Sequence, residues 1–371
     1  MAKEKKCCSS ENSCRLGKVG GQAVLEGVMM KAGEKTVTSC RKADGSIVVN
    51  DDKFVSVRKK NKLLNLPIIR GIINFVEMMI LSVKTLNASA DALGLEEEET
   101  KFEKWLKKHF GVGIVTVIMV LGVALGIALS LFLFMFLPIF IADLINNLAG
   151  GALGAWQKVI EGILKMGIFV LYLWLVTFMS DIKRTFMYHG AEHKTIACFE
   201  AGEELTVENV RKHTRFHPRC GTSFMFFMIL LGIIVGLVIY AIAPELDKWQ
   251  YTLLRLLILP LVVGVGYEFI MYAGKHNSII VRMLSAPGLW VQRLTTKEPT
   301  DDMLEVAIVS TKCALRDEFP EFMEYYKNRG WEAKEEKAEA GESEVLAEEN
   351  TVNENENSDE FLESSEHKDG E

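Results

Sequence analysis

The residues best suited to chemistry lie in His189-Gly190-Ala191-Glu192-His193. Residues four apart on a helix face the same way, so His189 and His193 can bind one metal ion together. Glu192 then lies beside both imidazoles, where it can act as a general base toward water. This H-x-x-E-H order is that of the inverted zinc peptidases. It predicts a divalent metal, with zinc as the first candidate.

A second group of potential ligands follows in His213-x3-His217-x2-Cys220. Histidine and cysteine are good zinc ligands, and the first motif lacks a third or fourth one. Pro218 interrupts any helix here, so the three side chains need not share a face. The alternative is that the Pro-Arg-Cys-Gly turn only delivers the chain into the next apolar segment.

Glu268 and His276 flank the end of an apolar run and are further candidates. An acidic residue at membrane depth needs a partner to be tolerated. Glu268 could therefore complete a metal site. The alternative is that it pairs with an Arg or His of another helix, and that the histidines of the first motif only make local hydrogen bonds.

Four apolar segments must position these residues, at 111–142, 163–180, 222–243 and 251–273. About 20 helical residues suffice to cross a bilayer, so each segment is a predicted transmembrane helix, the second with the help of its flanks.

The basic residues orient these segments. The loop 181–221 carries seven Lys and Arg, whereas the loops 143–158 and 244–250 carry one Lys each. Basic loops remain on the cytoplasmic side, so this pattern predicts cytoplasmic termini, a cytoplasmic loop with the histidine cluster, and a multipass protein of the cell membrane.

Residues 63–95 form an amphipathic segment. Arg70, Glu77 and Lys84 are spaced seven apart and form one polar stripe on a helix. Spanning would place three ionisable groups at membrane depth, which is costly. We predict an interfacial or re-entrant helix, with a fifth span as the alternative.

The remaining ordered parts are polar. Residues 17–62 read as a small β-rich cytoplasmic element with a hairpin turn at Asp44-Gly45. Residues 274–330 read as a cytoplasmic helical segment, with one helix from Thr300 through Leu315.

Both ends of the chain lack the apolar residues of a core, and we predict disorder for residues 1–16 and 331–371. The second tail carries 16 acidic residues and three lysines, so it accounts for the net charge of −7 and indicates nothing about a substrate. The seven scattered cysteines do not predict a disulfide framework. No basic patch interleaved with aromatic residues indicates nucleic acid; the expected partner is the lipid bilayer.

Four stretches carry a resemblance to the YqhQ-like family of bacterial multipass membrane proteins: GGQAVLEGVMM (20–30), HGAEHKTI (189–196), LTVENVRKH (205–213) and HPRCGTSF (217–224). The resemblance extends from about Val19 to about Leu315. This family is a domain of unknown function, sometimes labelled a predicted metal-dependent enzyme. The resemblance implies a bacterial inner-membrane protein and names no reaction.

These patterns predict an α-helical polytopic membrane protein with about four transmembrane helices, a small N-terminal β-rich element and a cytoplasmic helical cap. The leading hypothesis is a metal-dependent hydrolase at the cytoplasmic membrane surface, with Glu192 as base. The proposed metal ligands are His189 and His193, completed by His217, Cys220 or Glu268. The alternatives are a non-catalytic scaffold, regulator or small-solute or proton conduit, and a structural zinc with four protein ligands. Substrate and oligomeric state are not indicated.

Overall fold

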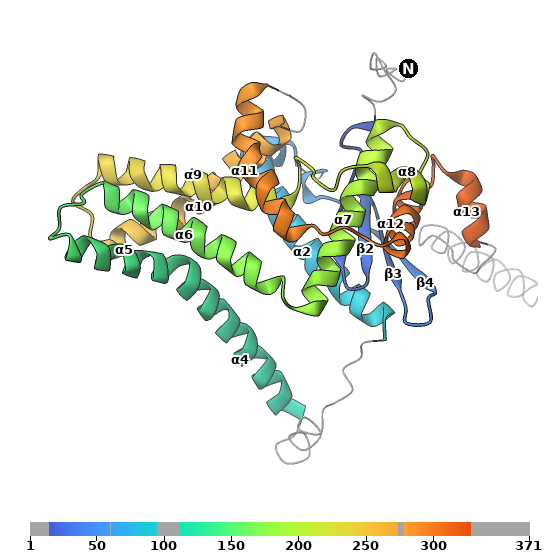
Figure 1. Cartoon of the computed structure of the whole chain (residues 1–371), viewed down its shortest axis with the longest axis horizontal. Helices are drawn as coiled ribbons and strands as arrows, with labels where there is room; N and C mark the ends of the chain where they lie inside the picture. Colours follow the sequence, from blue (N-terminus) through green and yellow to red (C-terminus); the bar gives the residue numbers. More distant parts are fainter. Residues whose placement is uncertain (1–14, 60, 95–111, 274–277, 328–371) are drawn as a thin grey trace, which may run out of the picture.

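The structure is a computed structural model that describes residues 15–59, 61–94, 112–273 and 278–327. Long apolar helices form a bundle at one end of the molecule, and a cap of mixed sheet and helix lies at the other (Figure 1). The mostly helical fold with four candidate spans and a small N-terminal sheet is confirmed. His276 and nearly all of the two predicted disordered tails lie outside the described residues.

The N-terminal element is an antiparallel sheet with the strand order β1-β2-β3-β4. Its strands are β1 (Val19–Val24), β2 (Gly27–Ala32), β3 (Lys35–Arg41) and β4 (Ile47–Lys53). Gly45 adopts a φ of 86°, which a glycine accepts without steric cost, and the predicted hairpin at Asp44-Gly45 is confirmed. Two short 3₁₀ turns, Val57–Lys59 and Lys62–Asn65, follow β4.

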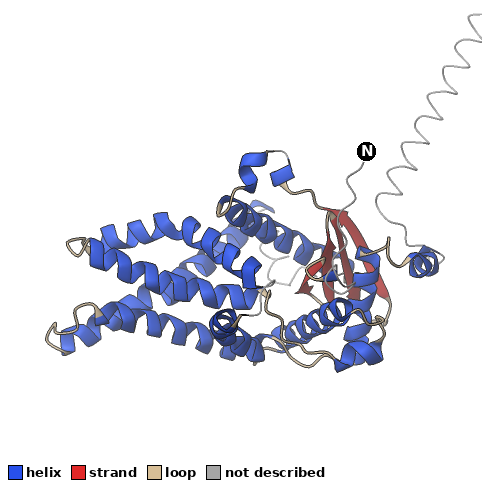
Figure 2. Ribbon diagram, turned by 90° about the horizontal axis from the view of Figure 1, so that it is seen from above, coloured by secondary structure: helices blue, strands red, loops and turns tan. Residues whose placement is uncertain are grey.

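Helices cover both faces of this sheet because successive side chains of a strand point to opposite faces. Val28 and Met30 pack into a core with α7 (Ser180–Ala201) and α12 (Asp301–Ala314). Met29, between them, packs on the other face with Leu81 of α2 (Ile69–Ala92). Figure 2 shows the sheet at the end of the molecule away from the tips of the bundle.

The cap is completed by three further helices: α8 (Val207–Lys212), α11 (Ile279–Thr295) and α13 (Pro320–Lys327). The predicted helix after Thr300 is confirmed as α12, which ends at Ala314.

Four helices among the described residues are long and apolar enough to cross a membrane: Leu121–Leu148, Trp156–Val176, Gly221–Ile242 and Trp249–Ala273. The first joins α4 (Val112–Leu131), a π-helical turn (Phe132–Phe136) and α5 (Leu137–Leu148). The others are α6 (Trp156–Val176), α9 (Gly221–Ile242) and α10 (Lys248–Ala273).

The second helix begins seven residues before the predicted segment 163–180 and ends at Val176. Its early start includes Lys158 and Glu161, charges that the hydropathy pattern places outside an apolar span. The carboxylate of Glu161 accepts from Nη1 of Arg255 on α10 at 2.6 Å. Pairing between helices therefore allows charged residues within this bundle.

The α2 helix connects the bundle to the sheet. Each residue of its polar stripe has a partner: Arg70 pairs with Glu268, Ser56 donates to Glu77 at 2.8 Å, and Lys84 contacts Asp52 at 2.7 Å. The stripe therefore faces the cap and α10. Six large apolar side chains of the same helix are exposed: Ile69, Val76, Met79, Ile80, Val83 and Leu86.

Candidate metal centre

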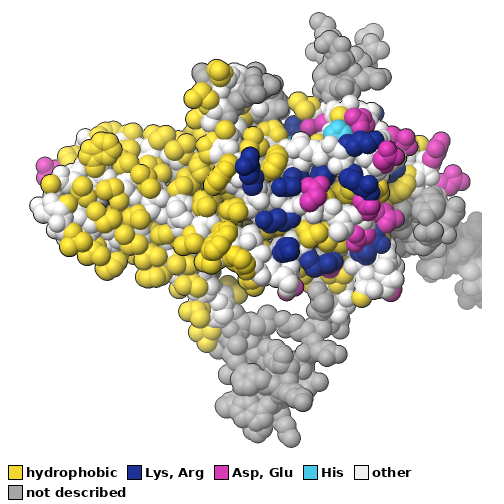
Figure 3. Space-filling view, in the orientation of Figure 1, with side chains coloured by type: hydrophobic (Ala, Val, Ile, Leu, Met, Phe, Trp, Pro, Cys, Tyr) yellow, Lys and Arg dark blue, Asp and Glu magenta, His cyan; other side chains and the backbone are white. Residues whose placement is uncertain are grey.

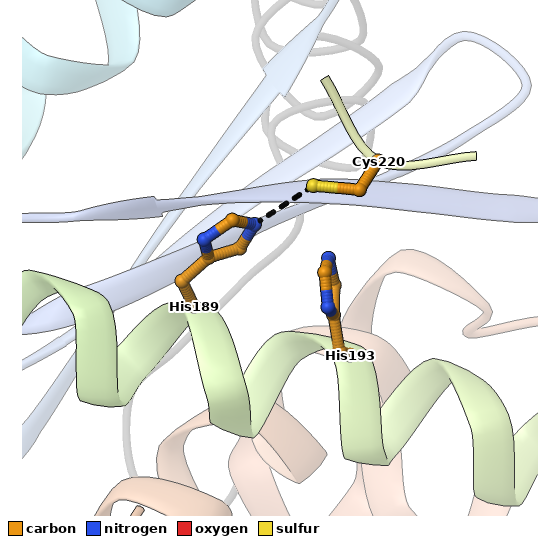
Figure 4. Close-up of side chains that lie close together, drawn as sticks. All are labelled: His189, His193 and Cys220. Carbon is orange, nitrogen blue, oxygen red and sulfur yellow. Dashed lines mark hydrogen bonds between the residues drawn. The ribbon is translucent and has the colours of Figure 1, made fainter. Parts of the chain in front are cut away.

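His189 and His193 project from one face of α7, as the spacing predicts, and their ring centroids are 4.4 Å apart. Cys220, the residue before α9, faces them (Figure 4). Its Sγ lies 3.3 Å from Nε2 of His189. One donor atom from each of these three residues lies within 4.8 Å of the other two. Helix α7 and the entry to α9 thus converge on one point.

Backbone carbonyls orient both imidazoles. Nδ1 of His189 donates to the carbonyl of Thr295 at 2.9 Å, and Nδ1 of His193 donates to that of Arg215 at 2.6 Å. A carbonyl oxygen can only accept, so Nδ1 carries a proton in both rings, and Nε2 is the nitrogen that remains for a metal ion. Metal-binding histidines are typically oriented by such a hydrogen bond.

Two glycines allow the chain to close around the site. A Cβ on Gly190 would lie 2.0 Å from the carbonyl oxygen of Lys297, so only glycine lets this segment lie directly on α7. The backbone N–H of Lys297 donates to the carbonyl of Phe186 at 2.8 Å and fastens the segment there. On the opposite side, a Cβ on Gly21 of β1 would lie 3.1 Å from Cγ of Glu192.

The thiol and the imidazole favour each other's charged forms. Burial alone would raise the pKa of Cys220, but the neighbouring His189 and His193 lower it well below its usual value. Burial alone would lower the pKa of His189, but Cys220 raises it to about 9. A thiolate is the form of cysteine that binds metal ions, so the lowered pKa suits Cys220 as a ligand. A metal ion at this site would replace the proton on Nε2 of His189.

Glu192 is buried beside the three donors without belonging to the group. Its Oε2 lies 3.9 Å from Nε2 of His189. Burial raises the pKa of its carboxyl group, and the charge of His193 opposes that shift. A raised pKa suits a general base that works near neutral pH.

His217 lies next to the group, with its ring centroid 5.6 Å from that of His193. Its Nε2 already accepts from Nη2 of Arg219 at 3.3 Å and lies 3.7 Å from Glu200. Gln292 of α11 holds the backbone at this point, since it accepts from the N–H of His217 at 2.9 Å and donates to the carbonyl at 2.7 Å.

The other predicted site residues lie elsewhere. Glu268 accepts from Arg70 of α2 through both carboxylate oxygens, which is the alternative that the sequence left open. His213 belongs to a separate group with Cys198 and Glu203.

Several residues that shape the site are not evident from the sequence. Thr295 and Arg215 contribute only their backbone carbonyls, for which no side-chain pattern exists. Gln292 lies on a helix that also carries Ser285, Arg293 and Thr295, so no sequence signal distinguishes it.

Residues 66–317 match the family described as "Protein of unknown function (DUF1385)". The chain is 39% identical over 303 residues to the uncharacterised protein YqhQ of Bacillus subtilis (strain 168), an alignment that covers 80% of this chain and 92% of the relative. No solved structure matches the chain.

Proposed function

The chain belongs to the YqhQ-like family of uncharacterised proteins, and for this member we propose a metal-dependent hydrolase that acts at the membrane surface. The observation that carries the proposal is the convergence of His189, His193 and Cys220, with both imidazoles oriented by backbone carbonyls.

The donor set suits zinc. Zinc bonds of about 2.0–2.1 Å to nitrogen and about 2.3 Å to sulfur, at a tetrahedral angle, separate the two ligand atoms by about 3.6 Å. The separation of 3.3 Å between Cys220 Sγ and His189 Nε2 is close to that value. Three protein ligands leave one coordination position for water or substrate, as in catalytic zinc sites, whereas structural sites use four.

Glu192 is the proposed general base. A zinc ion at this site supplies a Lewis acid that polarises a substrate and lowers the pKa of water. Glu192 accepts the proton from the attacking water and then delivers it to the leaving group. Its burial excludes bulk water from this transfer, and its contact with β1 at Gly21 keeps the side chain beside the ligands.

The proposed orientation places the site on the cytoplasmic side. Cys220 directly precedes the candidate span α9, so the site lies at the proposed membrane surface. Lys and Arg side chains gather on the cap, and the bundle beside it is apolar (Figure 3). Basic residues of this kind favour the cytoplasmic face. The exposed apolar side of α2 supports an interfacial position for that helix.

Zinc analysis of the purified full-length protein tests the metal, and variants separate binding from catalysis. We expect Cys220→Ala with His193→Gln to lose the zinc of this site. Glu192→Gln should retain it but hydrolyse chromogenic ester and fluorogenic peptide probes about 10²–10⁴ times more slowly. Cys313→Ala, which removes a buried thiol of α12 outside both potential metal-binding groups, is the matched control.

Loss of zinc in Glu192→Gln would identify Glu192 as a ligand and remove the proposed base. Hydrolysis that is unaffected by Glu192→Gln and by loss of the zinc would contradict the proposed mechanism.

A further inference from the structure

A second group of metal-binding side chains lies where α7 ends. Cys198 of α7, Glu203 of the following loop and His213, just after α8, each offer one ligand atom within 4.8 Å of the others. All three come from one segment of 16 residues. Gly202, with a φ of 79°, ends the helix and turns the chain so that Glu203 faces back.

The contacts in this group differ from those of an ordinary ion pair. Nε2 of His213 lies 3.1 Å from Oε2 of Glu203, yet this buried nitrogen makes no hydrogen bond within the described part of the chain. The two atoms are therefore close without the N–H pointing at the carboxylate. Cys198 is fully buried, and its Sγ contacts the Glu204 carbonyl only at 3.6 Å.

We propose that Cys198, Glu203 and His213 form a second divalent-metal site, suited to zinc. A thiolate, an imidazole and a carboxylate are the three side-chain types that zinc prefers. The metal joins the end of α7, the loop after it and the end of α8. This second site is distinct from the proposed hydrolytic site, because none of its three ligands is shared with the group of His189, His193 and Cys220.

The position of this segment gives the second metal a role in supporting the first site. Lys194 donates through Nζ to the carbonyl of Arg211 at 2.9 Å, and two residues after His213 the carbonyl of Arg215 accepts from His193. A metal that holds residues 198–213 therefore keeps the acceptor of His193 in place. Zinc at the second site should tighten zinc binding at the first one.

Metal analysis with zinc alone tests the proposal on the full-length protein in detergent, after dialysis against a weak chelator. The wild type should hold about two zinc ions per chain. Cys198→Ala with His213→Gln should hold about one, and so should Cys220→Ala with His189→Gln. The combination of all four substitutions should hold none, whereas Cys313→Ala should remain at two.

The variants of buried ligands could lose zinc because they misfold. Glu203→Gln tests the site without this risk, because the Glu203 side chain is 49% exposed. It should weaken binding of one of the two zinc ions at least tenfold in a chelator competition, while the thermal unfolding temperature of the zinc-free protein stays unchanged. The second site would be overturned if Glu203→Gln and the double variant Cys198→Ala with His213→Gln both bound as much zinc as the wild type, with the same affinity. Zinc lost only from those variants would instead contradict the first site and leave the second intact.

Discussion

Gly190 sets how closely the segment after α11 approaches the two histidines. The carbonyl oxygen of Lys297 occupies the space of a Cβ at this position, and Thr295, which accepts from His189, is two residues away. Any side chain at residue 190 must push this segment off α7. The orientation of His189 therefore depends on a residue that itself has no functional group.

We expect Gly190→Ala to lower the stability of the protein by about 1–3 kcal/mol through overpacking. The displaced Thr295 carbonyl should also weaken zinc binding at the first site by about 10–100-fold, the usual effect of losing a supporting contact. Thermal unfolding and chelator competition measure the two effects. Gly20→Ala is the control, since a Cβ there meets nothing within 4 Å. Equal zinc affinities of the two variants would show that the Thr295 contact is dispensable.

At the same scale, the sequence predicts only part of the centre. Helical periodicity alone places His189 and His193 on one face, because the rule needs no knowledge of other elements. The partners of Cys220 and Glu268 depend on how distant segments pack. Arg70 lies 198 residues before Glu268, and no local pattern reveals that pairing.

Among the elements, α6 and α10 are joined by charges inside the bundle. Glu161 is 2% exposed and contacts Arg255 and Lys158. Arg255 also donates to the carbonyl of Gly232 on α9 at 3.2 Å. Three candidate spans therefore meet at one ionic contact, and removal of one partner leaves an uncompensated buried charge.

We expect Glu161→Leu to destabilise the protein by about 3–5 kcal/mol, because Arg255, whose side chain is only 21% exposed, then lacks its carboxylate partner inside the bundle. The double variant Glu161→Leu with Arg255→Leu should recover much of this loss. Unfolding of the purified protein in mixed detergent micelles measures both. A double variant that is as unstable as the sum of the two single variants would mean that the two side chains do not interact.

The existence of most elements follows from local pattern, and their bounds follow from packing. The Asp44-Gly45 turn and the helix after Thr300 are predicted because turn and capping preferences are local. The start of α6 is not predicted correctly, because a hydropathy pattern counts Glu161 as a charge that ends an apolar segment. In the fold, Arg255 pairs with Glu161 and compensates its charge. The two-sided burial of the sheet also requires α2, whose role in the cap the sequence does not reveal.

In the whole molecule, the cap and the bundle are joined by three helices. Helix α2 packs against α10 at Gly71 and against the sheet at Leu81. Helix α7 follows directly after α6, and α11 packs along α9. The candidate metal centre lies where α7 and the end of α11 meet the start of α9. A change in how the cap sits on the bundle would therefore separate Cys220 from the two histidines.

The proposed orientation predicts which loops are accessible from outside the cell. Asn147, in the last turn of α5, and Glu245, just before α10, are exposed at the two turns with few basic residues, and Arg211 is exposed in the cap. In a background with Cys7, Cys8 and Cys14 replaced by Ser, the remaining four cysteines are buried. Cysteines introduced at Asn147 and Glu245 should then react with an impermeant maleimide in intact cells. A cysteine at Arg211 should react only after the membrane is permeabilised, and this background without an added cysteine is the control.

Labelling of Arg211→Cys alone in intact cells would show that the proposed orientation is inverted. The candidate metal centre would then lie at the outer surface, and the basic cap would contradict the positive-inside rule.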